Sequence, residues 1–157
     1  MQITLLAIGK TDDKRLSQLI EVYKKRLNHY VKFNFEIIPD LKKAKNLSES
    51  QQKNKEGELI LDKTQNSDTL ILLDEVGKQM DSIAFSKYLQ KHMNSGLKHL
   101  IFIIGGPYGF SDAVYQRANG TLSLSKMTFS HQMVRLFFTE QLYRGFTILR
   151  NEPYHHQ

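Results

Sequence analysis

One stretch that could form a ligand site is the glycine-rich turn Gly105-Gly106-Pro107-Tyr108-Gly109, which directly follows the apolar run 100–104. Because glycine has no Cβ, a flat or bulky ligand can approach this backbone closely, and exposed peptide N–H and C=O groups can read the edge of an adenine. A glycine pair by itself more often marks only a tight turn. The turn is therefore compatible with a nucleoside site and with a simple bend.

A second stretch whose side chains could take part in binding or catalysis is the polar part of the C-terminal segment. Polar residues interrupt the apolar segment 130–150, and the tail behind it adds an aromatic ring and two imidazoles. These residues are His131, Arg135, Glu140, Gln141, Arg144, Tyr154, His155 and His156. A ring can stack on a base, an imidazole can contact phosphate or move a proton, and an arginine can hold phosphate or stabilise an anion. Chain ends usually fray, however, so the tail alone is weak support for a function.

Several well-known binding motifs are missing from the sequence. The first strand-like segment is followed by Gly9 alone, whereas a dinucleotide fingerprint needs three glycines at that turn. Gly77-Lys78 is followed by Gln79, so the hydroxyl with which a phosphate loop holds Mg²⁺ is absent. His155 and His156 are adjacent and have neither cysteine nor an evident carboxylate as co-ligand. We therefore predict no metal site and no NAD or ATP site of these types.

The elements that must position these residues alternate regularly along the chain. Strand-like segments are predicted at 3–8, 33–38, 69–73, 100–104 and 121–125, and helices at 16–30, 48–63, 81–95, shortly after 110, and at about 130–150. Strict alternation predicts an α/β fold with a mostly parallel sheet and helices on both faces. Because no linker or repeat interrupts the pattern, we predict a single domain over residues 1–157.

In such a sheet, ligands bind beyond the carboxyl ends of the strands. Three segments of the second half of the chain end strands in this way: 73–78, 105–110 and 124–129. The sequence predicts all three to be loops and predicts a ligand site where they meet.

Composition limits the compartment and the partners. The 157 residues include no cysteine, and no apolar run reaches the 18 or so residues of a membrane span, so we expect a soluble, cytoplasmic protein without membrane association. A formal net charge of +6 favours a polyanionic partner such as RNA, although basic balance alone is common. The lysine-rich segment 40–46 is interpreted as a solvated loop, with contact to an RNA backbone as the alternative.

The last helix carries more apolar residues than one buried face requires. They are Met133, Val134, Leu136, Phe137, Phe138, Leu142, Tyr143, Phe146, Ile148 and Leu149. A second buried surface is needed, and we infer a homodimer, most commonly two-fold. The competing interpretation is a helix sandwiched within one subunit.

Taken together, the motifs resemble a known family. They are Leu5-Leu6-Ala7-Ile8-Gly9-Lys10, Lys55-Glu56-Gly57, Leu73-Asp74 with Gly77-Lys78, the segments 104–109 and 122–129, His131-Gln132-Met133-Val134-Arg135, Glu140-Gln141-Leu142-Tyr143-Arg144 and Pro153-Tyr154-His155. Their order and spacing are similar to those of the RlmH (YbeA) family of SPOUT-class methyltransferases, which act on bacterial large-subunit ribosomal RNA. The likeness runs nearly end to end.

The resemblance implies a fold, a cofactor and a substrate. It implies a deep trefoil knot in the C-terminal half, a knot that general folding rules would not suggest. It implies that S-adenosylmethionine (SAM) is held largely by backbone contacts. The cofactor-binding residues would be Leu73, Gly105, Leu124, Ser125, Lys126, Met127, Thr128 and Phe129. The methyl acceptor would be N3 of pseudouridine 1915 in 23S rRNA, on the assembled ribosome.

The resemblance also suggests roles for the C-terminal residues. The tail of one subunit would reach the cofactor site of its partner, with Tyr154, His155 and Arg144 as catalytic candidates and Glu140 as a weaker candidate for the base. Arg135, His131 and His156 would contact RNA. Two positions depart from the family pattern: Ser130 replaces a proline, and His156 replaces a lysine or arginine, which would weaken a phosphate contact above pH ~6.5.

Two other functions remain open at this level. A non-catalytic RNA-binding or ribosome-associated module would suit the basic charge and the tail equally well, but it would have no use for a nucleoside pocket. A nucleotide-binding α/β enzyme with different chemistry would bind ATP or NAD, which the missing glycine motifs disfavour.

Overall fold

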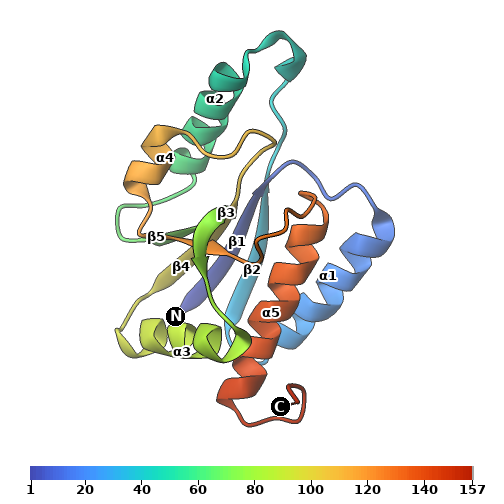
Figure 1. Cartoon of the computed structure of the whole chain (residues 1–157), viewed down its shortest axis with the longest axis vertical. Coiled ribbons are helices and arrows are strands. Elements are labelled where there is room, and N and C mark those ends of the chain that lie inside the picture. The colour runs from blue at the N-terminus through green and yellow to red at the C-terminus, as the bar shows by residue number, and fades with distance from the viewer. Residues whose placement is uncertain (157) are drawn as a thin grey trace.

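Five parallel strands form one sheet in the order β2-β1-β4-β3-β5 (Figure 1). The computed structural model describes residues 1–156. The strands are β1 (Gln2–Ile8), β2 (Lys32–Ile38), β3 (Thr69–Gln79), β4 (His99–Ile104) and β5 (Gly120–Ser123). The helices are α1 (Lys14–Leu27), α2 (Glu49–Asp62), α3 (Ser82–Asn94), α4 (Asp112–Arg117) and α5 (Met133–Leu149), with a short 3-10 turn at Ala44–Asn46. The predicted α/β fold with a parallel sheet is confirmed.

Helices cover both faces of the sheet, as predicted (Figure 1). On one face, strand residues such as Leu5 and Phe102 pack with Phe138 of α5 and with residues of α1 and α3. On the other face, Ile103 and its neighbours pack with residues of α2 and α4. Alternate residues of one strand thus enter different cores, which requires the continuous apolar runs seen in the sequence.

Local capping explains where three helices begin. Ser48 and Gln51 form a reciprocal capping box at the start of α2, as the sequence predicts. Asp81 accepts from the N–H of Ala84 at the start of α3, and Asp13 caps α1 in the same way. The spacing of Ser48 and Gln51 predicts the first of these caps, and for the second the sequence offers Asp81 or Ser82.

The prediction of a loop at 74–78 is wrong, because β3 continues to Gln79. Leu122 of β5 is paired with Leu73 and again with Lys78, so the residues between them form a bulge in a continuing strand. Gly77 lies directly against β5, and a Cβ there would be 2.7 Å from the backbone nitrogen of Leu122. Pairing with β5, a contact distant in sequence, therefore overrides a locally loop-like composition.

The boundaries at the end of the chain also differ slightly from prediction. Strand β5 ends at Ser123 rather than Ser125, and α5 begins at Met133 rather than near Ser130. Ser130 still serves the helix start, because its Oγ accepts from the N–H of Met133 at 3.2 Å. No helix within residues 1–156 is long and apolar enough to span a bilayer.

Candidate active site

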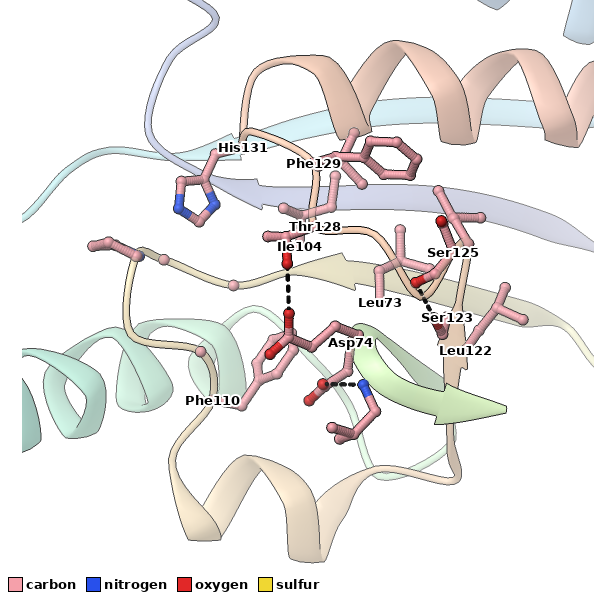
Figure 2. A pocket seen from close by; sticks show the side chains of 18 of the residues that line it. Leu73, Asp74, Ile104, Phe110, Leu122, Ser123, Ser125, Thr128, Phe129 and His131 are labelled. Carbon is pink, nitrogen blue, oxygen red and sulfur yellow. Dashed lines mark hydrogen bonds between the residues drawn. The ribbon is translucent and has the colours of Figure 1, made fainter. Parts of the chain in front are cut away.

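A cavity of about 580 Å³ lies at the carboxyl ends of β4 and β5, beside the bulge in β3 (Figure 2). Three groups of residues line it: Leu73–Val76 from the β3 bulge, Ile104–Phe110 after β4, and Leu122–Ser125 with Met127–Phe129 after β5. Tyr115 of α4, together with His131 and Val134 at the start of α5, completes the lining. The β3 bulge and the segments around the ends of β4 and β5 therefore meet at one site.

Seven of the eight predicted cofactor-binding residues line this cavity. They are Leu73, Gly105, Leu124, Ser125, Met127, Thr128 and Phe129. Lys126 is exposed and lies outside the lining. The placement puts these residues around one cavity of the size typical of ligand pockets, about 300–1,000 Å³, while their role in binding a cofactor stays a prediction.

The glycine turn after β4 is closely packed from behind. The N–H of Gly109 donates to the carbonyl of Gly106 at 3.1 Å, which closes the turn over Pro107 and Tyr108. A Cβ on Gly106 would lie only 2.1 Å from Oε2 of Glu56 on α2. Glycine at this position therefore allows a buried carboxylate to pack against the turn. The turn forms one wall of the cavity.

The loop after β5 is held by its own hydroxyl groups. Ser123 Oγ donates to the carbonyl of Ser125 at 2.8 Å, and the N–H of Met127 donates to Ser125 Oγ at 2.9 Å. Thr128 Oγ1 donates to Oε2 of Glu75 at 2.9 Å, and this bond joins two walls of the cavity (Figure 2). These bonds fix the shape of the loop in the absence of regular secondary structure.

Three polar groups of the lining were not among the predicted site residues: Asp74 and Glu75, which lie in the predicted ligand segment 73–78, and Tyr115. The Asp74 carboxylate accepts from the Tyr115 hydroxyl and, at 3.1 Å, from the N–H of Val76. Burial and the bond to Asp74 raise the pKa of Tyr115 to about 12, so this hydroxyl keeps its proton. Asp74 and Glu75 follow a strand that was expected to border the site, and this position could have identified them. Nothing in the sequence marks Tyr115.

His131 and Arg135, both predicted to bind RNA, differ in accessibility. His131 is exposed at the edge of the cavity, where partial burial and, secondarily, the charge of Arg135 lower its pKa. Arg135 is only 1% exposed and donates to the carbonyls of Ile8 and His131 and to Oγ1 of Thr11. These contacts tie the β1–α1 loop to the start of α5. They favour a positioning role for Arg135, so RNA binding by this residue stays a prediction without structural support.

The catalytic candidates of the tail form a separate cluster at the other end of α5. Tyr154 donates to Oε1 of Glu140 at 2.9 Å, and Arg144 donates to the same oxygen at 2.6 Å. The Arg144 guanidinium lies 4.7 Å from the centre of the Tyr154 ring and 3.4 Å from Nδ1 of His155. The Tyr23 hydroxyl of α1 lies 3.3 Å from that of Tyr154. The tail is therefore packed against α1 and α5.

This cluster is separate from the lining of the cavity in the same subunit. Val134 lines the cavity near the first turn of α5, whereas the tail follows the last residue of the helix (Figure 1). Tyr154, His155 and Arg144 are not among the lining residues, although the Tyr154 hydroxyl reaches back to Glu140, which is six residues or about 9 Å along the helix from Val134. The tail and the cavity of one subunit therefore do not form a single site.

The protonation of the tail is set by its packing. Burial, together with bonds to Tyr23 and Glu140, raises the pKa of Tyr154, so its hydroxyl is a donor at neutral pH. His156 is exposed. Within residues 1–156, no group of three or more histidine, cysteine, aspartate or glutamate residues could hold a metal ion.

Comparison with known proteins gives consistent results over the whole chain. A family model described as "Predicted SPOUT methyltransferase" matches residues 1–155. The chain is 71% identical to the ribosomal RNA large subunit methyltransferase H of Christiangramia forsetii, 69% identical to that of Flavobacterium johnsoniae and 59% identical to that of Parabacteroides distasonis. Each comparison covers 100% of both chains. The protein belongs to the SPOUT methyltransferase family, and the predicted resemblance is confirmed.

Proposed function

We propose that this protein methylates ribosomal RNA of the large subunit, using SAM to modify N3 of pseudouridine 1915 in 23S rRNA. The observation that carries the proposal is the cavity of about 580 Å³ in which the β3 bulge meets the segments that follow β4 and β5. The relatives named as large subunit methyltransferases, which match the chain end to end, support the substrate class. A ribosomal substrate also implies action in the cytoplasm.

The lining of the cavity fits a methyl-sulfonium nucleoside. Leu73, Ile104 and Leu124 offer apolar surface to a flat ring, and the glycine turn exposes backbone groups that can read its edge. Asp74 and Glu75 supply negative charge for a cationic ligand. These are the features that binding SAM largely through backbone contacts would need.

SAM, when bound, supplies a methyl group that its positive sulfur already activates for transfer. The protein must then align the acceptor nitrogen with this methyl group and exclude competing water. Pseudouridine N3 carries a proton that must leave, so a group that accepts the proton or stabilises the imide anion assists the reaction. Among the tail residues, His155 offers a ring nitrogen for the proton, whereas Arg144 can stabilise an anion.

We infer that the tail of one subunit completes the cavity of its partner. Neither Tyr154 nor His155 lines the cavity of its own subunit, so a catalytic role for either residue would require a second copy of the chain. The outer surface of α1 and α5 is suited to this contact, because it exposes four large apolar residues. They are Leu19 (48% exposed), Val22 (43%), Met133 (39%) and Phe137 (39%). A two-fold homodimer through this surface, and the trefoil knot that the family implies, belong to the proposal.

The decisive measurement is methyl transfer from labelled SAM to ribosomes that lack the modification, with free rRNA as the comparison substrate. We expect incorporation at a single pseudouridine and more of it on ribosomes than on free RNA. Titration calorimetry with SAM tests the alternative. An absence of heat, with RNA binding preserved, would instead support a non-catalytic RNA-binding module.

A hybrid dimer tests whether the tail acts on the partner. Tyr154→Ala removes the tail contribution, and Gly105→Val blocks the cavity, because even a Cβ at this position lies 3.1 Å from the Phe110 ring. Each homodimer should be nearly inactive. Dimers re-formed from a mixture contain one intact combined site, so activity should reappear in the mixed sample. Continued inactivity after subunit exchange, verified by tagged subunits, would contradict a shared site.

Val22→Glu provides a test of the interface that leaves the cavity untouched. A buried, unpaired carboxylate at a two-fold contact is strongly unfavourable, so we expect sedimentation at the mass of a monomer. This monomer should still bind SAM but should not transfer the methyl group. Full methylation by a monomer would contradict the role assigned to the second copy.

A further inference from the structure

We infer that the carboxylates of Asp74 and Glu75 make the cavity select the charged cofactor SAM over its neutral product S-adenosylhomocysteine (SAH). The inference rests on the proposed function, because it assumes that SAM occupies this cavity. It assigns to the β3 bulge a role that differs from holding the nucleoside. The two carboxylates would strengthen the binding of SAM before methyl transfer relative to the binding of SAH after it.

The charge of the lining is one-sided. Asp74 and Glu75 are the two carboxylates among the lining residues, and within residues 1–156 no lysine or arginine lines the cavity. His131 adds little positive charge at neutral pH, because partial burial lowers its pKa. Lys126, the nearest lysine in the β5 loop, is exposed outside the lining. A ligand in the cavity therefore meets a negative wall.

Both carboxylates are held by neutral donors. Tyr115 donates to Asp74. The N–H of Val76 also donates to Asp74, and Thr128 donates to Glu75 (Figure 2). Neither carboxylate belongs to any of the ion pairs found among the described residues. Neutral donors fix the direction of a carboxylate without cancelling its charge. The negative charge is therefore oriented and is not neutralised by an ion pair among the described residues.

The reaction itself changes the charge of the ligand. Methyl transfer breaks the bond between the positive sulfur and the methyl carbon, and the electron pair of that bond stays on sulfur as a neutral thioether. A new bond joins the methyl carbon to N3, whose proton leaves to a base. SAM thus carries one positive charge more than SAH while sharing nearly all its other atoms. A negative wall distinguishes the two ligands by this single charge.

The size of the cavity sets the scale of the effect. A sphere of the cavity volume is about 10 Å across, so a charge inside lies within roughly that distance of both carboxylates. At that range and at a dielectric between that of a protein surface and water, each carboxylate changes the affinity ratio by about two- to tenfold. A hydrogen bond from the carboxylates to ribose hydroxyls would act differently, because both ligands share the ribose and would gain equally.

Calorimetry on the full chain separates these two roles. We would measure dissociation constants of SAM, SAH and sinefungin, an analogue with an ammonium group in place of the methyl-sulfonium. The proteins are the wild type, Glu75→Gln, Asp74→Asn and the control Glu58→Gln. Each variant keeps an acceptor oxygen and loses one negative charge. Glu58 is exposed on α2 and is not part of the cavity lining.

The expected result is a lower ratio of the SAH constant to the SAM constant in both cavity variants, by about two- to tenfold, with sinefungin following SAM. The control variant should keep the wild-type ratio. Thr128→Val keeps both charges and should largely retain the ratio. That result would show that a change in cavity shape alone does not lower the ratio in the other variants. An unchanged ratio in folded Glu75→Gln and Asp74→Asn would overturn the inference while leaving the proposed function intact. Failure of the wild type to bind any of the three ligands would overturn both.

Discussion

The buried carboxylate of Glu56 leads to a prediction about stability and pH. Glu56 is 3% exposed, and its Oε1 accepts from Nε2 of Gln52 at 2.9 Å, but its buried Oε2 has no hydrogen-bond partner among the described residues. This oxygen lies against Gly106, where it supports the glycine turn of the cavity. A charged oxygen without a partner in such a place should make the native state less stable.

The sign of the pH dependence follows from the direction of the shift. Burial raises the pKa of Glu56, the Gln52 bond lowers it, and the charge of Asp40 raises it further, with a net increase. The native state therefore binds a proton more tightly than the unfolded chain, whose glutamates titrate near pH ~4.3. Below that pH, both states are protonated and the penalty is absent. As pH rises through the native pKa, the free energy of unfolding falls by the full penalty.

Glu56→Gln should remove this penalty while keeping the Oε1 acceptor for Gln52. An unsatisfied buried polar group costs about 1–3 kcal/mol, and more if charged, while the amide NH₂ of glutamine would itself lack a partner. We therefore expect the variant to be more stable by about 1–2 kcal/mol at pH 8 and equal to the wild type near pH 4. The gain should appear between these two values.

Urea unfolding at pH 4, 6 and 8, at one protein concentration, measures the effect. The matched control is Glu58→Gln on the same helix, whose exposed side chain should give no pH-dependent difference. A gain of equal size at all three pH values would show that ionisation is not its cause. A variant less stable than the wild type at pH 8 would refute the reasoning, because the carboxylate would then be making a favourable contact.

Three further substitutions test individual contacts. Arg135→Met leaves two carbonyls and a hydroxyl without their donor and should lower the free energy of unfolding by about 2–4 kcal/mol in urea titrations. A change within experimental error would contradict the role of Arg135 in connecting the β1–α1 loop to the start of α5. Gly77→Ala forces a Cβ against the backbone of Leu122, so β3 and β5 must separate. It should weaken SAM binding at least tenfold by calorimetry, whereas unaltered affinity would remove the bulge from the site. Thr128→Val removes the bond to Glu75 at nearly constant volume and should weaken SAM and SAH binding equally, by about two- to tenfold, and a selective effect on one ligand would count against a purely positioning role.

The alternation of apolar strands and amphipathic helices was enough to predict the fold class. The run 100–104, for example, is apolar throughout because β4 is buried on both faces between β1 and β3. The sheet order was not predictable in the same way, since local periodicity does not say which strand lies beside which. The β3 bulge shows the same limit. Asp74 to Gly77 have the composition of a loop, and only pairing with β5 keeps the strand going.

The candidate site was predicted in its position and only partly in its residues. The rule that ligands bind beyond the carboxyl ends of parallel strands brought the correct segments together around Leu73 and Gly105. It could not find Tyr115, because this residue lies on a helix, α4, and the sequence does not show that α4 folds back toward Asp74 after the glycine turn. The burial of Arg135 could not be predicted for a similar reason. An arginine on an apolar helix gives no sign in the sequence that loop carbonyls will surround it.

The position of the tail along α5 determines how the two halves of the proposed site can be combined. The first turn of the helix borders the cavity, whereas Tyr154 packs farther along the helix, against Glu140 and Arg144, and does not line the cavity. Bending the tail back would break the packing of Tyr154 on Arg144 and its bond to Glu140. A two-fold axis near the middle of the helix would bring a tail to a cavity without breaking these contacts, since it places the last turn of one copy beside the first turn of the other. On this argument, dimer formation would assemble the catalytic site as well as bury the exposed apolar residues of α1 and α5.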